Sequence, residues 1–336
     1  NKIKPNLYIT STGLYSTYGP AFDFLIKNNI KCKLSKTGFF GHSSKPEVVY
    51  FADTIMEKLS SGDYWNQYKN KPVSQEMRDK VNKYFMKRFK GHTFNLARFN
   101  YMQEGEFFRV DKNDGYKYHI VMLPHVIWDG NVKARHTAFN GYLEWMVSTV
   151  NYVKDRKDIL LYIKAHPAEL KRKLTDKSGR VLNLIKKQVD LDNISNIITI
   201  PPKQKIETYK FFQSGIDLGL TYDGFLSIEM IYLKIPVITC VKGGRFSVDN
   251  GNYTINDKTE YFNYLDNIDS LLEEFHNNYE KRLENIIRYL YWYLYENTVR
   301  LPIIIRKGKG TAYYDLKHLT KDDFKIDKNF LEFINR

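Results

Sequence analysis

The chain has 336 residues, of which 43% are hydrophobic, and it is therefore long enough for two domains with separate cores. Lys and Arg number 52 against 38 Asp and Glu, which gives a net charge of +14. This excess fits an anionic small ligand, an anionic membrane or glycan surface, or nucleic acid, and it equally fits lysines spread over solvated faces. No recognised nucleic-acid-binding motif occurs, so we expect no nucleic-acid partner.

Cysteine use and hydropathy point to a reducing compartment and to the absence of a membrane span. Cys32 and Cys240 lie in apolar strand-like runs, and no CxxC or Cys/His cluster suggests a zinc site or a disulfide framework. No signal peptide is visible, and no apolar run reaches the ~18–20 residues of a membrane helix. We expect a cytoplasmic protein, with peripheral contact at the inner face of the membrane as an open alternative.

The first part of the chain alternates strands with helices, as in a Rossmann-like domain. A glycine-containing loop at residues 38–45 follows the second strand, but it does not form GxGxxG and gives only weak support for dinucleotide binding. Ser74 has the position of an N-cap for a long helix. The expected strands are 7–10, 30–34 and 118–123, and the expected helices are 21–27, 46–59 and 74–90.

The second part of the chain predicts βαβ units and a parallel sheet. Its expected strands are 159–163, 197–200, 216–220 and 236–241, and its expected helices lie near 168–190, 205–213 and 226–234. We place the domain boundary near residues 131–138, which gives a first domain at 1–135 and a second at 136–279. Residues 280–336 begin with an amphipathic helix and are expected to pack back against the first domain.

An aromatic stripe on that amphipathic helix has two interpretations. The rings could lie on a membrane surface, but packing of the helix across both domains is the favoured interpretation. The stripe comprises Tyr289, Tyr291, Trp292, Tyr293 and Tyr295.

Two positions in the second part fall where parallel strands are expected to end. His166 follows the strand at 159–163, and Gly224 follows the strand at 216–220. In open α/β sheets, ligands bind outside the carboxyl ends of the strands. These two positions therefore mark the expected ligand site.

Four segments, taken in order, resemble the bacterial capsule and surface-polysaccharide biosynthesis proteins, which are glycosyltransferases of the GT-B type. Residues 124–129 (Pro-His-Val-Ile-Trp-Asp) are similar to the end of the family's first domain, and residues 163–169 (Ile-Lys-Ala-His-Pro-Ala-Glu) to its Lys-x-His-Pro-x-Glu motif. Residues 222–237 are similar to a helix start with a later Glu and Ile-Pro-Val, and residues 251–262 to a Gly and Glu-Tyr-Phe region. The resemblance implies an α/β fold of the GT-B class, in which two Rossmann-like domains face a cleft.

The chain departs from the family at Gly224 and Phe225, where the family usually has Ser-Thr. The family's hydroxyls would contact donor phosphate, whereas here backbone N–H groups at a helix start would do so. By resemblance, the favoured donor is a CMP-activated acidic sugar such as Kdo or a sialic-acid-like nonulosonate. The resemblance implies no metal ion or other cofactor, provided that His166, Lys164 and helix N–H groups neutralise the leaving phosphate.

The residues that the resemblance assigns to the donor nucleotide lie in the second domain. His166 would contact the phosphate, Lys164 would assist it, and Glu229 would bind the ribose hydroxyls. The alternatives are a loop histidine satisfied by backbone, a solvated lysine and an exposed helix carboxylate. The donor-binding set is Lys164, His166, Pro167, Gly224, Phe225 and Glu229.

The predicted acceptor side includes the expected catalytic base. Asp129 ends the last strand assigned to the first domain, where a carboxylate could take the proton of an acceptor hydroxyl; an Asp in a turn is the alternative. Residues 128–130 (Trp-Asp-Gly) are also loosely similar to an acidic motif of some bacterial sialyltransferases. Acceptor or sugar contacts are expected at His42, Ser43, Lys45 and Arg245, for which solvent-exposed loops are the alternative.

The function implied by the resemblance is a glycosyltransferase of capsule or lipopolysaccharide assembly, which moves a sugar from a nucleotide to a glycan or lipid-linked glycan acceptor. Two other classes stay open. One is a different GT-B enzyme, such as a glycerophosphotransferase or a sugar-nucleotide epimerase. The other is a non-catalytic module that binds a glycan or a nucleotide.

Overall fold

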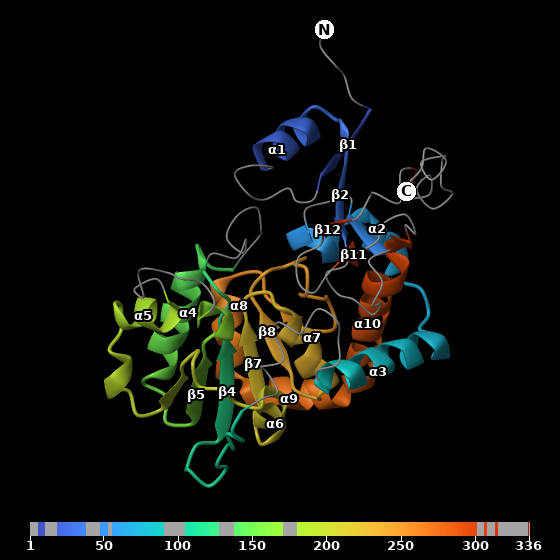
Figure 1. Cartoon of the computed structure of the whole chain (residues 1–336). Coiled ribbons are helices and arrows are strands. Elements are labelled where there is room, and N and C mark those ends of the chain that lie inside the picture. Colours follow the sequence, from blue (N-terminus) through green and yellow to red (C-terminus); the bar gives the residue numbers. More distant parts are fainter. Residues whose placement is uncertain are drawn as a thin grey trace. The chain divides into compact units, whose positions relative to one another are not determined.

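The chain folds into two compact units (Figure 1). The first comprises Asn1–Phe99 and Ile287–Arg336, and the second comprises Asn100–Ile286. The chain returns to the first unit within helix α10 (Tyr279–Tyr291). The computed structural model describes residues 6–10, 19–37, 48–52, 56–90, 105–127, 138–170, 180–300, 306–307, 313–314 and 335.

The described part of the second unit is built on a six-stranded sheet in which all neighbouring strands are parallel (Figure 1). In spatial order the strands are β6 (Ile197–Ile200), β5 (Ile159–Lys164), β4 (Tyr118–Leu123), β7 (Leu218–Thr221), β8 (Val237–Thr239) and β9 (Tyr253–Thr254). Numbered along the chain, this is the Rossmann order 3-2-1-4-5-6, which reverses between β4 and β7. The predicted α/β class with a parallel sheet is confirmed.

The sequence explains this sheet, because every residue of β4 and β5 is buried, as expected for parallel strands covered on both faces. Crossover connections are right-handed, so the connections on the two sides of the reversal place their helices on opposite faces. The helices that follow β4, β5, β6 and β7 are α4 (Tyr142–Val153), α5 (Val181–Lys186), α6 (Thr208–Gln213) and α7 (Phe225–Tyr232).

Strand β4 corrects the predicted domain boundary. Its residues pair with β5 from Tyr118↔Ile159 onward and with β7 from Ile120↔Leu218 onward, so it is central to the second unit's sheet. The prediction assigned this strand to a first domain ending at residue 135, whereas the units divide at Phe99 and Asn100. A strand that is apolar on both sides must lie in a sheet whose two faces are covered. Its sequence does not say, however, which strands it pairs with.

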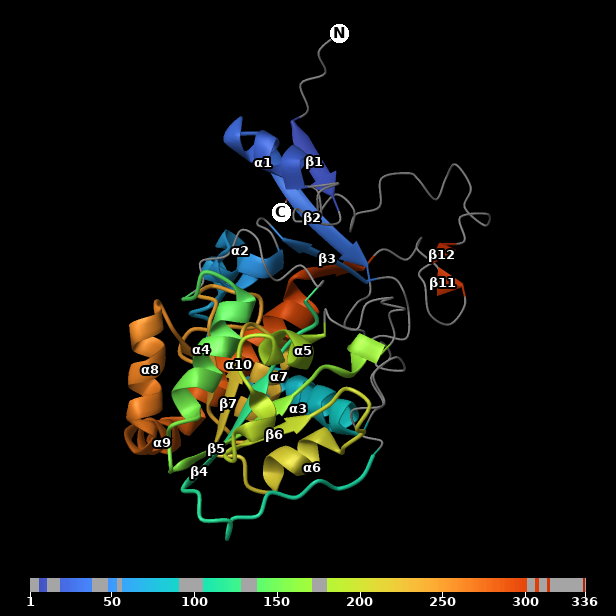
Figure 2. The same ribbon diagram turned by 90° about the vertical axis from the view of Figure 1, so that its left-hand side faces the viewer.

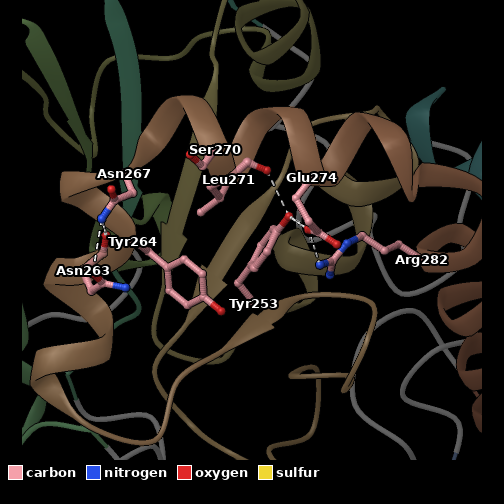
Figure 3. Close-up of a pocket in the computed structure, with 8 residues that line it drawn as sticks. All are labelled: Tyr253, Asn263, Tyr264, Asn267, Ser270, Leu271, Glu274 and Arg282. Carbon is pink, nitrogen blue, oxygen red and sulfur yellow. Dashed lines mark hydrogen bonds and ion pairs between the residues drawn. The ribbon is translucent and has the colours of Figure 1, made fainter.

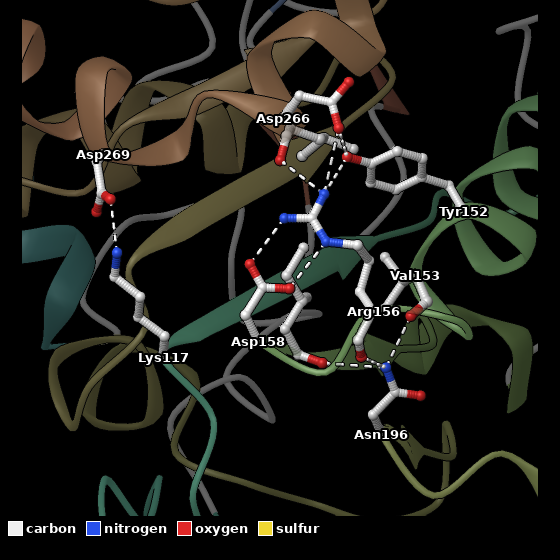
Figure 4. Close-up of polar contacts among 10 residues, drawn as sticks. Lys117, Tyr152, Val153, Arg156, Asp158, Asn196, Asp266 and Asp269 are labelled. Carbon is white, nitrogen blue, oxygen red and sulfur yellow. Dashed lines mark hydrogen bonds and ion pairs between the residues drawn. The ribbon is translucent and has the colours of Figure 1, made fainter.

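Later in this unit the structure describes α8 (Lys258–Asp266) and α9 (Ile268–Asn277), which lie next to each other (Figure 2). Helix α8 packs against α4, where Trp145 Nε1 donates a hydrogen bond to Tyr261 Oη at 3.2 Å. The turn between α4 and β5 is fixed by polar contacts (Figure 4). Arg156 binds Asp158 with two hydrogen bonds of 2.8 and 2.7 Å, and it also lies 3.3 Å from Asp266 at the end of α8.

The first unit has a mixed sheet, with β1 (Leu7–Thr10) and β2 (Lys31–Thr37) parallel, and β3 (Val48–Ala52) and β10 (Thr298–Arg300) antiparallel to their neighbours. A short hairpin, β11 (Arg306–Lys307) with β12 (Tyr313–Tyr314), is also described. The helices are α1 (Gly19–Lys27), α2 (Asp63–Tyr68) and α3 (Gln75–Phe89).

Two predictions for the first unit can be judged at its helices. The predicted cap is confirmed, because Ser74 Oγ accepts a hydrogen bond from Met77 N at 3.3 Å. The predicted helix at 46–59 is wrong, since the chain there forms β3 and the 3₁₀ helix Met56–Ser61. The run Val-Val-Tyr-Phe in β3 is β-branched and aromatic, and such residues pack better on a pleated strand.

The aromatic stripe covers the end of α10 and the π-helical turn that follows it (Trp292–Glu296), and it belongs to the first unit. Tyr289, Trp292 and Tyr293 are buried, and the Trp65 ring lies 5.0 Å from Tyr289 and 5.3 Å from Trp292. These rings are therefore core residues and not a membrane-facing surface. Among the helices that the structure describes, none is long and apolar enough to cross a membrane.

Candidate functional site

The reversal of strand order marks the candidate site. Leu123 at the end of β4 pairs with Thr221 at the end of β7, so the segments that leave these two strands start side by side. Ligands of doubly wound α/β folds bind at this point because the helices on either side diverge there. The segments that leave are Pro124-His125 after β4 and Tyr222-Asp223-Gly224 after β7.

His125 and Gly224 are in direct contact across the reversal. A Cβ atom built on Gly224 would lie 2.5 Å from His125 Cε1 and 2.9 Å from Nε2, so only glycine permits this approach. Tyr142 of α4 holds the histidine from the other direction: its hydroxyl donates to the His125 carbonyl at 3.2 Å and accepts the His125 N–H. The sequence did not predict His125 as a site residue, although it lies in segment 124–129, one of the four that carry the family resemblance.

His166 begins the turn after β5, on the same carboxyl edge of the sheet. Its carbonyl accepts a hydrogen bond from Glu169 N at 3.0 Å, and its Nδ1 accepts one from Ala168 N, also at 3.0 Å. Since Nδ1 accepts, the hydrogen of the neutral ring is on Nε2, the atom that can donate to a phosphate oxygen. The side chains of His166 and Pro167 are half-buried.

Lys164, the last residue of β5, is 7% exposed. Burial lowers the pKa of its amino group to about 8. Among the residues that the structure describes, no carboxylate or other polar group lies within hydrogen-bonding distance of this amino group. A buried cation of this kind is stabilised by an anion, because an opposite charge offsets the lost hydration.

Glu169, the acidic residue of the Lys-x-His-Pro-x-Glu segment, is fully buried. Its Oε1 accepts a hydrogen bond from Val181 N at 3.0 Å, which joins the His166 turn to the start of α5. Burial raises the pKa of Glu169, while the Val181 N–H and the charge of Arg180 act in the opposite direction. The contacts assign Glu169 a structural role behind the turn.

Helix α7 starts at the opposite strand end, with Gly224 as its N-cap in an extended conformation. The Ser227 hydroxyl lies 2.7 Å from the Gly224 carbonyl oxygen and 2.8 Å from that of Phe246, which fixes the first turn. The Phe225 ring packs edge-on against Phe246 at 5.1 Å. The Ser227 N–H donates to the Gly224 carbonyl oxygen at 2.9 Å. The N–H groups in the first turn of a helix generally lack a partner in the helix and carry partial positive charge, so this end can receive a phosphate.

Asp223 fixes the loop that carries Arg245. Its carboxylate accepts hydrogen bonds from Arg245 N at 3.0 Å, Phe246 N at 2.8 Å and Ser247 Oγ at 3.3 Å. Gly244 passes so close that an added Cβ would lie 2.8 Å from the carboxylate. The half-buried Arg245 guanidinium stacks on the Phe246 ring at 4.9 Å, so the structure brings this predicted residue to the β7 strand end.

Glu229 is not exposed at this edge. Its side chain is fully buried, and its Oε1 accepts a hydrogen bond from Tyr209 Oη at 2.7 Å. In this arrangement the carboxylate ties α7 to α6, and the predicted contact with a ribose stays a prediction.

Four predicted residues, Asp129, His42, Ser43 and Lys45, lie outside the described residues, so their roles stay predictions. Within the described ranges, no group of three or more His, Cys, Asp or Glu side chains could hold a metal ion.

No protein-family model matches this chain, and no curated protein matches it either. Among solved structures, it is similar to a Thermosulfurimonas dismutans KpsC β-Kdo 2,4 transferase, with a TM-score of 0.48 and 13% identity over 83% of this chain and 78% of that chain. A KpsC β-Kdo 2,7 transferase of the same organism gives 0.42 and 14%, over 75% and 69%. The UDP-GlcNAc 2-epimerase from Neisseria meningitidis gives 0.29 and 14%, over 66% and 50%. Similarities at this level assign neither an activity nor a residue role to this chain.

Proposed function

We propose that this protein is a glycosyltransferase of bacterial surface-polysaccharide assembly that uses a nucleotide-sugar donor. One observation carries the proposal: the Rossmann-ordered sheet places the Lys-x-His-Pro-x-Glu segment and the glycine-capped start of α7 on the same carboxyl edge. These are the two segments that the sequence resemblance assigns to the donor. The contact between His125 and Gly224 adds a third group at the centre of that edge.

The residues of this edge suit the departure of a nucleotide. When the sugar leaves, negative charge grows on the phosphate, and preorganised donors stabilise it most effectively where water is excluded. His166 Nε2, the amino group of Lys164 and the first-turn N–H groups of α7 would supply these donors. In this proposal the positive groups replace a metal ion.

Acceptor activation is the second part of the proposal. Attack by an acceptor hydroxyl requires a base, and Asp129 follows β4 by six positions in the sequence. His42, Ser43 and Lys45 would contact the acceptor, and Arg245 would pair with an acidic sugar. A CMP-activated acidic sugar is the proposed donor, and a glycan or lipid-linked glycan is the proposed acceptor.

The test is a transfer assay with CMP-, UDP- and GDP-activated sugars and a panel of oligosaccharide acceptors. His166→Ala should reduce turnover at least about tenfold, a lower bound because a lost oxyanion donor costs about 10²–10³, while the protein still unfolds cooperatively. His276→Ala is the matched control, since His276 is exposed on α9 and lies outside the site.

Two results would oppose the proposal. Wild-type turnover by His166→Ala would remove the histidine from the reaction. Conversion of the donor without any dependence on acceptor would favour an epimerase instead of a transferase.

A further inference from the structure

The second unit contains a hollow that is separate from the candidate site, because no residue of the strand ends described above lines it. It lies between edge strand β9, helices α8 and α9, and the start of α10, and its volume is about 390 Å³ (Figure 3). This volume falls in the range of small-ligand pockets, roughly 300–1,000 Å³.

The inner wall of the hollow is a fixed group of three side chains. The Arg282 guanidinium stacks on the Tyr253 ring at 4.1 Å and donates a hydrogen bond to Glu274 Oε2 at 2.6 Å. The Tyr253 hydroxyl bonds to the same carboxylate and to the Leu271 carbonyl oxygen. Although burial acts to raise the pKa of Glu274, the hydrogen bonds from Tyr253 and Arg282 lower it overall, so the wall carries one paired positive and one paired negative charge.

The outer wall combines an aromatic ring with hydrogen-bonding groups (Figure 3). The half-exposed Tyr264 ring meets Tyr253 edge-on at 5.3 Å. Asn267 Nδ2 donates to the Asn263 carbonyl oxygen at 2.9 Å and to Asn263 Oδ1 at 3.2 Å, which leaves Asn267 Oδ1 and Asn263 Nδ2 for other partners. Within the described residues, the hydroxyls of Tyr264 and Ser270 have no hydrogen-bond partner.

We propose that this hollow binds a neutral sugar unit of a glycan. A sugar has an apolar C–H face that packs on a ring such as Tyr264, and hydroxyls that both donate and accept. The amides and hydroxyls of the wall supply acceptors as well as donors, which matches hydroxyls better than an anion. An anionic group would meet the Glu274 carboxylate, while the charge of Arg282 is already paired. A peptide or protein partner would require a wider apolar surface than Leu271 and the rings of Tyr253 and Tyr264 provide.

This site goes beyond the proposed transfer reaction and does not depend on it. If both hold, a second contact with the glycan raises its effective concentration near the enzyme without adding a contact at the reaction site. Binding to the hollow and binding of a nucleotide at the strand ends can therefore be measured, and can fail, separately.

The probe is a printed array of bacterial oligosaccharides with neutral and acidic members, read with the wild-type chain. Tyr264→Ala removes the aromatic wall, and Ser270→Trp fills the hollow from an exposed position. Both should weaken retention on neutral oligosaccharides at least about tenfold, while the melting-temperature shift produced by CMP stays unchanged. Asn277→Ala, exposed on α9 and not lining the hollow, should retain the array as the wild type does.

The proposal is overturned if no neutral oligosaccharide is retained, or if retention survives both variants. It is also overturned if acidic oligosaccharides are preferred. A third opposing result would be variants that alter only the oligomeric state in solution, which would identify the hollow as a self-association surface. If CMP does not raise the melting temperature of the wild type, that result counts against the proposed nucleotide site and not against the sugar site in the hollow.

Discussion

Replacing Lys164 with methionine tests whether the end of β5 is built for an anion. Lys164 as a whole is 7% exposed, and burial lowers the pKa of its amino group to about 8. The methionine keeps most of the apolar stem and removes this amino group. Without a ligand, the folded protein carries a charge at this position that burial disfavours. The variant should therefore be more stable than the wild type at neutral pH and weaker in nucleotide binding.

The magnitude follows from the pKa difference. The ordinary pKa is 10.5 and the folded value is about 8, and each unit corresponds to about 1.36 kcal/mol, so the penalty is about 3 kcal/mol. Between these values the folded state binds fewer protons than the unfolded state, so wild-type stability gains from this group as the pH rises. The penalty is complete below pH 8 and vanishes above about pH 10.5.

The assay is urea unfolding of both proteins between pH 7 and pH 10. The stability advantage of Lys164→Met should shrink by about 2.5 kcal/mol across this range. Buried tyrosines also titrate at high pH, but they do so in both proteins and cancel in the difference. The exposed control Lys187→Met should stay within about 0.5 kcal/mol of the wild type at pH 7.

Nucleotide binding gives the second readout. Wild-type affinity should fall above pH 8 as the amino group loses its proton, whereas the variant should bind more weakly and without that dependence. A stability difference that does not change with pH would show that Lys164 is hydrated. Equal nucleotide affinity in both proteins would remove it from the site.

Three further substitutions address the strand ends. Gly224→Ala should lower the free energy of unfolding by about 1–3 kcal/mol and weaken nucleotide binding, because the added methyl group meets the His125 ring. Gly141→Ala is the control, since Gly141 has open space around it, and equal effects of the two variants would refute the contact with His125. Asp223→Ala should cost about 3 kcal/mol, because it leaves buried N–H groups unpaired, and should speed proteolysis within residues 243–247. An unchanged cleavage rate would show that Asp223 does not fix this loop. Asp129→Asn should cut turnover by about 10²–10⁴ without affecting nucleotide binding, and full activity would exclude it as the base.

Much of the second unit was predictable because its strands are short apolar runs separated by clear breaks. The expected ends of β5 and β7 therefore led to His166 and Gly224 from the sequence pattern, whereas Lys164 came from the family resemblance. The roles of all three in ligand binding stay predictions. The membership of β4 was not predictable, since pairing partners of a doubly buried strand are set by long-range contacts.

The direction in which side chains point was also not predictable from the sequence. The sequence placed Glu229 on a helix after Gly224, but only the packing of α7 on Tyr209 shows that the carboxylate faces inward. The contact between His125 and Gly224 joins positions about a hundred residues apart, and a glycine in a sequence does not reveal what approaches it.

The most direct test for a nucleotide site in the second unit is hydrogen–deuterium exchange with and without CMP at a saturating concentration. If a nucleotide binds at the carboxyl edge of the second unit, protection should appear in the turn at residues 165–169 and in the first turn of α7 at residues 224–228. Stabilisation should reach about 2.7 kcal/mol at a hundredfold excess over Kd. Protection confined to other segments, or none with CMP, CDP, UDP or GDP, would contradict a nucleotide site between these strand ends.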